Sequence, residues 1–238
     1  MIGFWDYFNV SFSSLVPFDL IDDADLSISS EVKLLQRQWS TQFPGDEHPV
    51  LALYHVPGSF PVLSGNRFIQ KYFKWNVKLL AEAHAIKRRL FKGDKYLGIH
   101  LRVGEDWGRV CDLAVGKSST YFASPQCKSP FNGRIFQEMC YPDLDHILEL
   151  TREAIVTFGF HHLYIASDDK PYKEEFQQIL DPHNVTVHHY NPLSPQMDLI
   201  ILGEADYFIG NCISTFTSFI KRERDANDRL STFWGYPI

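Results

Sequence analysis

The sequence predicts an α/β protein built on a parallel sheet with crossover helices. From residue 96 onward, short apolar runs of strand length alternate with longer segments of helical periodicity, an alternation typical of parallel sheets. Segment 143–158 carries its apolar residues on one face, as a helix packed on a sheet does. The chain has 238 residues, of which 45% are hydrophobic and 22% charged, enough to form a sizeable core.

The first 65 or so residues give a less regular signal. Segment 29–39 reads as a helix with a serine cap, and segment 48–53 reads as a strand. The acidic run 22–25 is most simply a solvated loop. Proline and glycine between residues 57 and 66 break the pattern, which suggests a domain boundary there.

The remaining elements follow in order. Apolar positions recur at helical spacing from 68 to 90, as one long helix or two. After them we expect strand 96–101, a cysteine-bearing loop 104–140, helix 143–158, strand 162–166, helix 171–180, strand 185–190, helix 196–205, strand 207–211 and helix 215–226.

Composition and charge exclude some classes of protein. The net charge of −6 argues against a nucleic-acid partner, because proteins that bind nucleic acids concentrate positive charge. No apolar stretch reaches the roughly 18 residues needed to span a membrane, and the amino terminus lacks the pattern of a signal peptide. Asn9 and Asn184 nevertheless stand in N-glycosylation sequons, a feature of secretory proteins.

The four cysteines lack the Cys-x-x-Cys spacing of a zinc or redox site. Two disulfides or four buried thiols remain possible. The Pro- and Ser-rich surroundings of Cys127 favour a disulfide, because a loop without a core of its own gains most from a covalent tie.

Two segments carry candidate ligand-binding residues at the carboxyl ends of predicted strands, where parallel sheets bind their ligands. In "GIHLRVGEDWGRVC", His100 and Arg102 face the same side of the strand, and Arg102 provides a planar charge suited to a phosphate. The alternative is an ion pair between Arg102 and Asp106 that only orders the loop, and the spacing slightly favours it.

The second segment is 210–217, where a strand turns into a helix. The free N–H groups of such a helix start bind anions, although Ser214 or Thr215 as a plain helix cap is the commoner use of these residues. Both segments lie at the carboxyl ends of predicted strands, and one supplies charge while the other supplies backbone donors. Together they favour a phosphate-binding site.

Asp168 and Asp198 follow in the same layer. A carboxylate accepts hydrogen bonds from the donors of a guanine edge or from ribose hydroxyls, whereas Asp198 could equally be an ordinary acid at a helix start. Gly-x-Gly-x-x-Gly, Walker and Gly-x-Ser-x-Gly motifs are absent from the sequence. The residues alone therefore predict a nucleotide-type phosphate site on a parallel sheet.

The motifs "YLGIHLRVGEDWGRVC", "FASPQC", "CYPDL" and "DLIILGEADYFIGNCISTFTSFIKRERD" resemble the GDP-fucose protein O-fucosyltransferase family that acts on EGF-like repeats. The resemblance implies a GT-B-type α/β fold: a remnant of the amino-terminal lobe and interlobe segment in 1–65, a Rossmann-like nucleotide-sugar lobe in 66–212, and a carboxy-terminal helix returning toward the amino-terminal lobe in 213–238.

The resemblance also implies an inverting transfer of fucose from GDP-fucose to Ser or Thr hydroxyls of EGF-like repeats in Notch-type receptors. It implies the endoplasmic reticulum lumen as the location and no required divalent metal. The signal peptide, the Gly-x-x-Gly-Asn-Gln loop and the retention tail of the family are not found in this sequence. An inactive, truncated transferase and a non-catalytic module that binds GDP-fucose or EGF repeats, or acts like a chaperone, both stay open.

Roles for single residues follow from the same resemblance. Arg102 is expected to be catalytic and to reach the diphosphate beside His100, with Asp106 orienting it or touching the donor. Ser214, Thr215 and Phe216 are expected at the phosphate, and Asp168 and Asp198 at the nucleoside. The family pattern pairs Cys111 with Cys140 and Cys127 with Cys212.

Overall fold

A computed structural model describes residues 41, 44, 46–47, 70, 73–117, 127, 134–190, 194–236 and 238. The predictions for segments 22–25, 29–39, 48–53 and 57–66 and for Asn9 lie outside the described residues. Residues 77–238 form a compact unit of their own, and this unit carries the candidate site.

A five-stranded parallel sheet forms the centre of this unit and confirms the predicted architecture. The strands stand in the order β3-β2-β1-β4-β5, and every neighbouring pair is parallel. In register, Ile99 of β1 lies between Ile165 of β2 and Ile209 of β4. The strands are β1 (Tyr96–Leu101), β2 (His162–Ser167), β3 (Thr186–His189), β4 (Tyr207–Gly210) and β5 (Ser231–Phe233).

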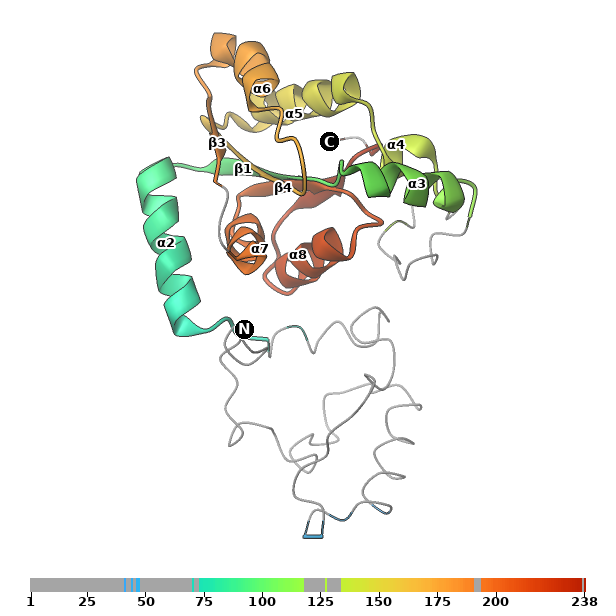
Figure 1. Cartoon of the computed structure of the whole chain (residues 1–238). Helices are drawn as coiled ribbons and strands as arrows, with labels where there is room; N and C mark the ends of the chain where they lie inside the picture. The colour runs from blue at the N-terminus through green and yellow to red at the C-terminus, as the bar shows by residue number, and fades with distance from the viewer. Residues whose placement is uncertain are drawn as a thin grey trace. The chain divides into compact units, whose positions relative to one another are not determined.

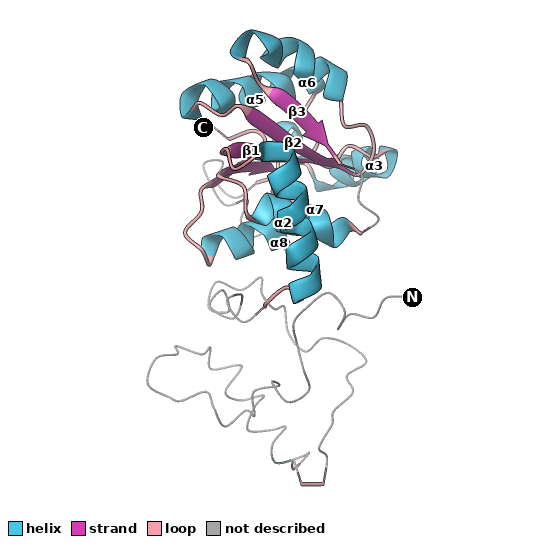
Figure 2. Cartoon of the chain, turned by 90° about the vertical axis from the view of Figure 1, so that its left-hand side faces the viewer, coloured by secondary structure: helices cyan, strands magenta, loops and turns pink. Residues whose placement is uncertain are grey.

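Helices cover both faces of the sheet (Figures 1 and 2). On one face lie α5 and α6, and on the other lie α7 and α8, while α2 packs against α7. The helices are α2 (Val77–Phe91), α3 (Glu105–Ala114), α4 (Gln137–Cys140), α5 (Leu144–Phe158), α6 (Lys173–Leu180), α7 (Pro195–Gly203) and α8 (Thr215–Asp225), with a short 3-10 helix at Asp181–His183.

The main core lies between the sheet and helices α5 and α6. Leu97, Ile99 and Leu101 are fully buried there, because alternate side chains of β1 face this side of the sheet. Helix α5 adds Ile147, Leu150, Ala154 and Ile155 to the cluster, the face that its sequence periodicity predicts. Its start is capped by Asp143, whose carboxylate accepts from the amide of His146, and Gly159 ends it with a φ of 67°.

Helix α7 lies directly against β1 on the other face. A Cβ atom at Gly98 would stand 2.9 Å from Leu202, so the absence of a side chain there allows this close packing. The end of α7 is held by the buried Arg224 of α8, whose guanidinium donates to the carbonyl groups of Leu202, Gly203 and Ala205. These carbonyls end a helix, where a cation is favourable, and burial lowers the pKa of Arg224 to about 10.

The structure differs from the predictions in three places. Helix α2 begins at Val77, whereas helical spacing starts at residue 68. The predicted loop 104–140 contains α3 and α4, which the Cys111–Cys140 disulfide ties together. Strand β5 extends the sheet with three residues, too few to show a period. No helix among the described residues is long and apolar enough to cross a membrane.

Candidate nucleotide-binding pocket

A pocket of about 310 Å³ opens at the carboxyl ends of β1 and β2. It lies near the switch point of the sheet, which is the junction of the neighbouring strands β1 and β4. After β1 the chain continues to β2 on one side of this junction, and after β4 it continues to β5 on the other side. Its walls contain all the predicted ligand-binding residues except Asp106, which forms an ion pair with Arg102. The lining residues are His100, Arg102, Ala166, Ser167, Asp168, Pro195, Asp198, Ser214, Thr215 and Phe216.

A second pocket, of about 370 Å³, lies at the opposite ends of the strands. Glu204 closes part of it by binding Lys87 at 2.6 Å and His84 at 3.1 Å, so its charges are partly paired within the protein. Because ligands of open parallel sheets bind at the carboxyl ends of the strands, we assign the site to the smaller pocket.

Arg102 is held between two carboxylates. One side of its guanidinium binds Asp106 through Nη2 at 2.7 Å, and the other side binds Asp168 through Nη1. The ring of Trp107 lies 4.8 Å from the guanidinium carbon, a cation–π contact. Hydrogen bonding to Arg102 lowers the pKa of the exposed Asp106 carboxyl. The ion pair between Arg102 and Asp106, which the sequence offered as an alternative to phosphate binding, is therefore present. Arg102 also lines the pocket.

Asp168 contacts Arg102 and the backbone of its loop. It accepts hydrogen bonds from the amides of Val103 at 2.8 Å and Gly104 at 3.2 Å, so it fixes both the loop and the guanidinium. Gly104 is required for this geometry, because a Cβ there would lie 2.7 Å from Asp168 and 3.0 Å from Arg102. Asp168, expected at the nucleoside end, thus contacts the predicted catalytic residue.

His100 is buried in the wall of the pocket. Its Nδ1 lies 2.7 Å from Oγ1 of Thr217, and its ring is 4.7 Å from that of Phe216, measured between centroids. Burial, together with the charge of Arg102, lowers the pKa of His100 to about 3. The imidazole is therefore neutral at physiological pH.

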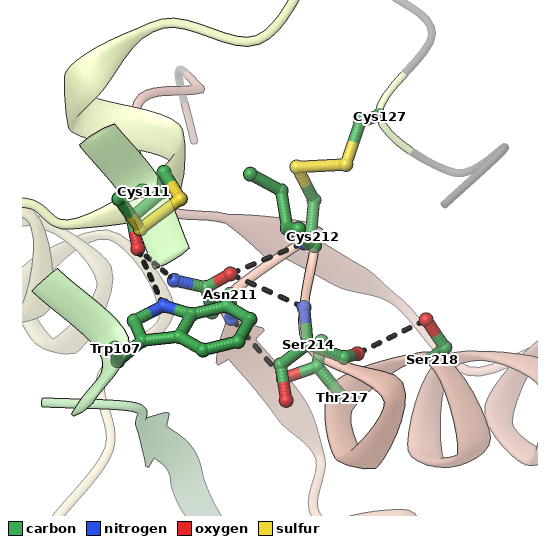
Figure 3. Close-up of a disulfide and its surroundings, with 10 residues drawn as sticks. Trp107, Cys111, Cys127, Asn211, Cys212, Ser214, Thr217 and Ser218 are labelled. Carbon is green, nitrogen blue, oxygen red and sulfur yellow. Dashed lines mark hydrogen bonds between the residues drawn. A yellow bond between two sulfur atoms is a disulfide. The ribbon is translucent and has the colours of Figure 1, made fainter. Parts of the chain in front are cut away.

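The start of α8 is shaped by Asn211 rather than by a cap at Ser214, whose side chain makes no capping hydrogen bond. The side-chain oxygen of Asn211 accepts from the amides of Ile213 at 3.1 Å and Ser214 at 3.3 Å (Figure 3). Ser214, Thr215 and Phe216, at the start of α8, line the pocket. The first N–H groups of a helix have no partner within the helix, so this start can bind an anion.

Asp198 faces the pocket from the first turns of α7. Its carboxylate accepts a 2.6 Å hydrogen bond from the hydroxyl of Tyr164. Burial raises the pKa of Asp198 from 3.8 to about 7, although the Tyr164 bond partly offsets this. The group therefore changes ionisation near physiological pH.

Both disulfides are present with the pairing that the resemblance implies, Cys111–Cys140 and Cys127–Cys212. They meet at Asn211, whose side-chain amide donates to the carbonyl of Cys140 at 2.5 Å (Figure 3). The indole of Trp107 donates to the same carbonyl at 2.9 Å. The pocket wall is thus tied to both covalent links.

The sequence did not single out three residues that support this wall without lining it: Trp107, Asn211 and Thr217. All three lie inside the quoted motifs, close to the predicted ligand-binding residues. Their polar or aromatic side chains were the signal that could have identified them. Asn184, the described sequon residue, is exposed with a φ of 55° in a surface turn.

Comparison with known proteins points to one family. A family model described as GDP-fucose protein O-fucosyltransferase matches residues 1–227. GDP-fucose protein O-fucosyltransferase 1 of Caenorhabditis elegans is 33% identical over 240 residues, covering 98% of this chain and 60% of that protein.

Solved structures similar to this chain include members of the same family. POFUT1 in complex with GDP-fucose aligns with a TM-score of 0.75 at 33% identity, over 84% of this chain and 59% of that one. POFUT1 in complex with GDP aligns with a TM-score of 0.74 at 34% identity, over 84% and 60%. This chain thus spans about three fifths of the length of these relatives. The likeness confirms the predicted GT-B-type α/β fold class.

Proposed function

Because the chain belongs to the GDP-fucose protein O-fucosyltransferase family, we propose that its pocket binds GDP-fucose and that the protein transfers fucose to Ser or Thr hydroxyls of EGF-like repeats. One observation carries the proposal. A cationic side chain, the start of a helix and a half-buried carboxylate, from segments far apart in sequence, converge on one pocket. Relatives of similar sequence bind GDP and GDP-fucose in their solved structures.

Arg102 is the proposed catalytic residue. The acceptor oxygen forms a bond to the anomeric carbon as the bond from that carbon to the phosphate breaks, which inverts the sugar. GDP leaves with negative charge, and the hydroxyl proton is released. A guanidinium and helix amides placed where this charge develops lower the barrier. Both groups border the pocket, Arg102 on one wall and the start of α8, at Ser214 to Phe216, on another.

The two carboxylates on Arg102 have different roles in this proposal. Asp106 is exposed, so a diphosphate can replace it on the guanidinium at little cost. Asp168 is anchored by two backbone amides as well, and it stays in place as a positioning residue. Binding of the donor thus exchanges one anionic partner of Arg102 for another.

Asp198 is the proposed contact to guanine. An ionised carboxylate accepts from the two adjacent donors of the guanine edge, and Asp198 lines the pocket from α7. We propose no required metal ion, because Arg102 and α8 supply positive charge to the diphosphate.

We place the reaction in the endoplasmic reticulum lumen, with EGF repeats of Notch-type receptors as acceptors. That compartment allows disulfides to form and glycosylates exposed sequons such as Asn184. The predicted domain limits, 1–65, 66–212 and 213–238, stay predictions.

The test is calorimetric titration with GDP and transfer of fucose to a folded EGF repeat, for the wild type and Arg102→Ala. Arg152→Ala is the matched control, because Arg152 pairs with Glu149 on the exposed side of α5. Loss of binding and transfer in Arg102→Ala alone supports the proposal. Binding without transfer in the wild type supports the non-catalytic module, and absence of GDP binding refutes both the transferase and a module that binds GDP-fucose.

A further inference from the structure

A buried chain of hydrogen bonds ends on the ring of His100. The amide of Asn211 donates to Oγ1 of Thr217 at 3.1 Å, and Oγ1 lies 2.7 Å from Nδ1 of His100. All three residues are at most 4% exposed. Figure 3 shows Thr217 at the start of α8, directly below Asn211. The chain therefore links the turn after β4 to a residue of β1 that lines the pocket.

The position of one hydrogen atom follows from these contacts. The Thr217 oxygen carries a single hydrogen, and it already accepts from the amide of Asn211. Within the described part of the chain, the acceptor that this hydroxyl reaches is Nδ1 of His100. If Nδ1 carried its own proton instead, the hydroxyl hydrogen would be left without an acceptor in a buried place, which is costly.

We infer that Thr217 is a positioning residue, whose hydroxyl donates to Nδ1 of His100 and holds the imidazole in the tautomer protonated on Nε2. The inference rests on the proposed function, since it specifies how the same pocket recognises its ligand. In the part of the chain that the structure describes, Nε2 makes no hydrogen bond, and His100 lines the pocket. The Nε2–H group is thus a donor for a bound molecule.

This tautomer matches the rest of the wall. Arg102 and the amides at the start of α8 are donors, and Nε2–H adds a neutral donor from β1. Phosphate and ribose oxygens are acceptors, so a nucleoside diphosphate finds donors both at the end of β1 and at the start of α8. The other tautomer would turn a lone pair toward those oxygens and repel them. The Phe216 ring, 4.7 Å from the imidazole of His100, helps to hold the imidazole in its orientation.

Nitrogen NMR of protein labelled with ¹⁵N-histidine tests the inference without ligand, since long-range proton couplings distinguish the two tautomers. His100→Ala identifies the signal of His100. We expect the Nε2–H tautomer in the wild type and in Thr217→Ser, which keeps the hydroxyl, and its loss in Thr217→Val. Thr151→Val is the matched control, because Thr151 is a fully buried threonine whose hydroxyl bonds to Ile147 in α5.

Calorimetry with GDP is the second readout. Thr217→Val should weaken GDP binding by about 10-fold, the order of one hydrogen bond to a charged group, and serine should restore it. A wild-type His100 protonated on Nδ1 overturns the inference, as does a Thr217→Val variant with unchanged tautomer and affinity. The Nε2–H tautomer in a wild type that binds no GDP would refute the proposed function and leave the tautomer assignment intact.

Discussion

Replacing Asp198 by asparagine should remove a pH dependence from the stability of the fold. In the folded protein the pKa of Asp198 is raised from 3.8 to about 7, because the carboxyl is buried beside Tyr164. Between these values the unfolded chain releases the proton while the folded chain retains it. The stability contributed by this group is therefore complete below pH 4 and is lost as the pH rises toward 7.

The size of the effect follows from the two pKa values. A difference of this size corresponds to about 4 kcal/mol, lost at up to about 1.4 kcal/mol per pH unit. The pocket is open to water, which screens the charge, so we expect about 2–4 kcal/mol. The asparagine side chain has no proton to release, and its amide oxygen can still accept from the Tyr164 hydroxyl.

Urea unfolding at a series of pH values from about 4 to 8, with the disulfides intact, measures this difference. Relative to the wild type, Asp198→Asn should gain stability as the pH rises through this range and level off above 7. Asp145→Asn is the control, because Asp145 is exposed in the first turn of α5. Parallel curves for the wild type and Asp198→Asn would refute a raised pKa at this position.

Four further predictions concern the pocket and its supports. Affinity for GDP in calorimetry should rise from about pH 6 to 8 as Asp198 ionises, and Asp198→Asn should flatten this rise; an unchanged rise would exclude Asp198 as the cause. Gly104→Ala should weaken GDP binding by about 10-fold, because its Cβ displaces Arg102 and Asp168, whereas Gly108→Ala, with open space around it, should not; equal affinities would contradict the steric argument. Arg224→Met should cost about 3 kcal/mol in urea unfolding, because the carbonyls of Ala205 and Leu230 lose the guanidinium as their donor, and a loss below about 1 kcal/mol would show that water replaces it. Fucose transfer should persist in excess EDTA, and a loss that Mn²⁺ or Mg²⁺ restores would contradict a metal-free mechanism.

Regular patterning made most of the fold predictable. Strand 96–101 is buried throughout, and α5 has a clear apolar face, so both appear in the sequence nearly as they stand in the structure. Helix α3 was missed because charged residues and Gly108 break its apolar pattern, and because its burial depends on a disulfide partner nearly thirty residues away. Strand β5 is stabilised by pairing with β4, a contact that local sequence cannot show.

The sequence was enough to predict where the candidate site residues lie, but it was less informative about which of them bind one another. Residues at strand ends meet at one edge of the sheet whatever the loops do, so His100, Arg102 and Ser214 could be brought together from the sequence. The choice of Asp168 as a partner of Arg102 depends on how the loop at Gly104 turns, which spacing does not reveal.

The pocket is lined by the end of β1 and by the start of α8, which follows β4, so its assembly depends on the pairing of these two strands. Leu97 pairs with Tyr207 across a long stretch of chain that contains β2, β3 and their helices, and contacts this distant in sequence close slowly because the loop entropy must be lost first. Under the proposed function, GDP binds only after that closure. GDP should therefore act as a folding ligand: at a hundred times its dissociation constant it adds about 2.7 kcal/mol to the finished lobe and nothing to partly folded chains.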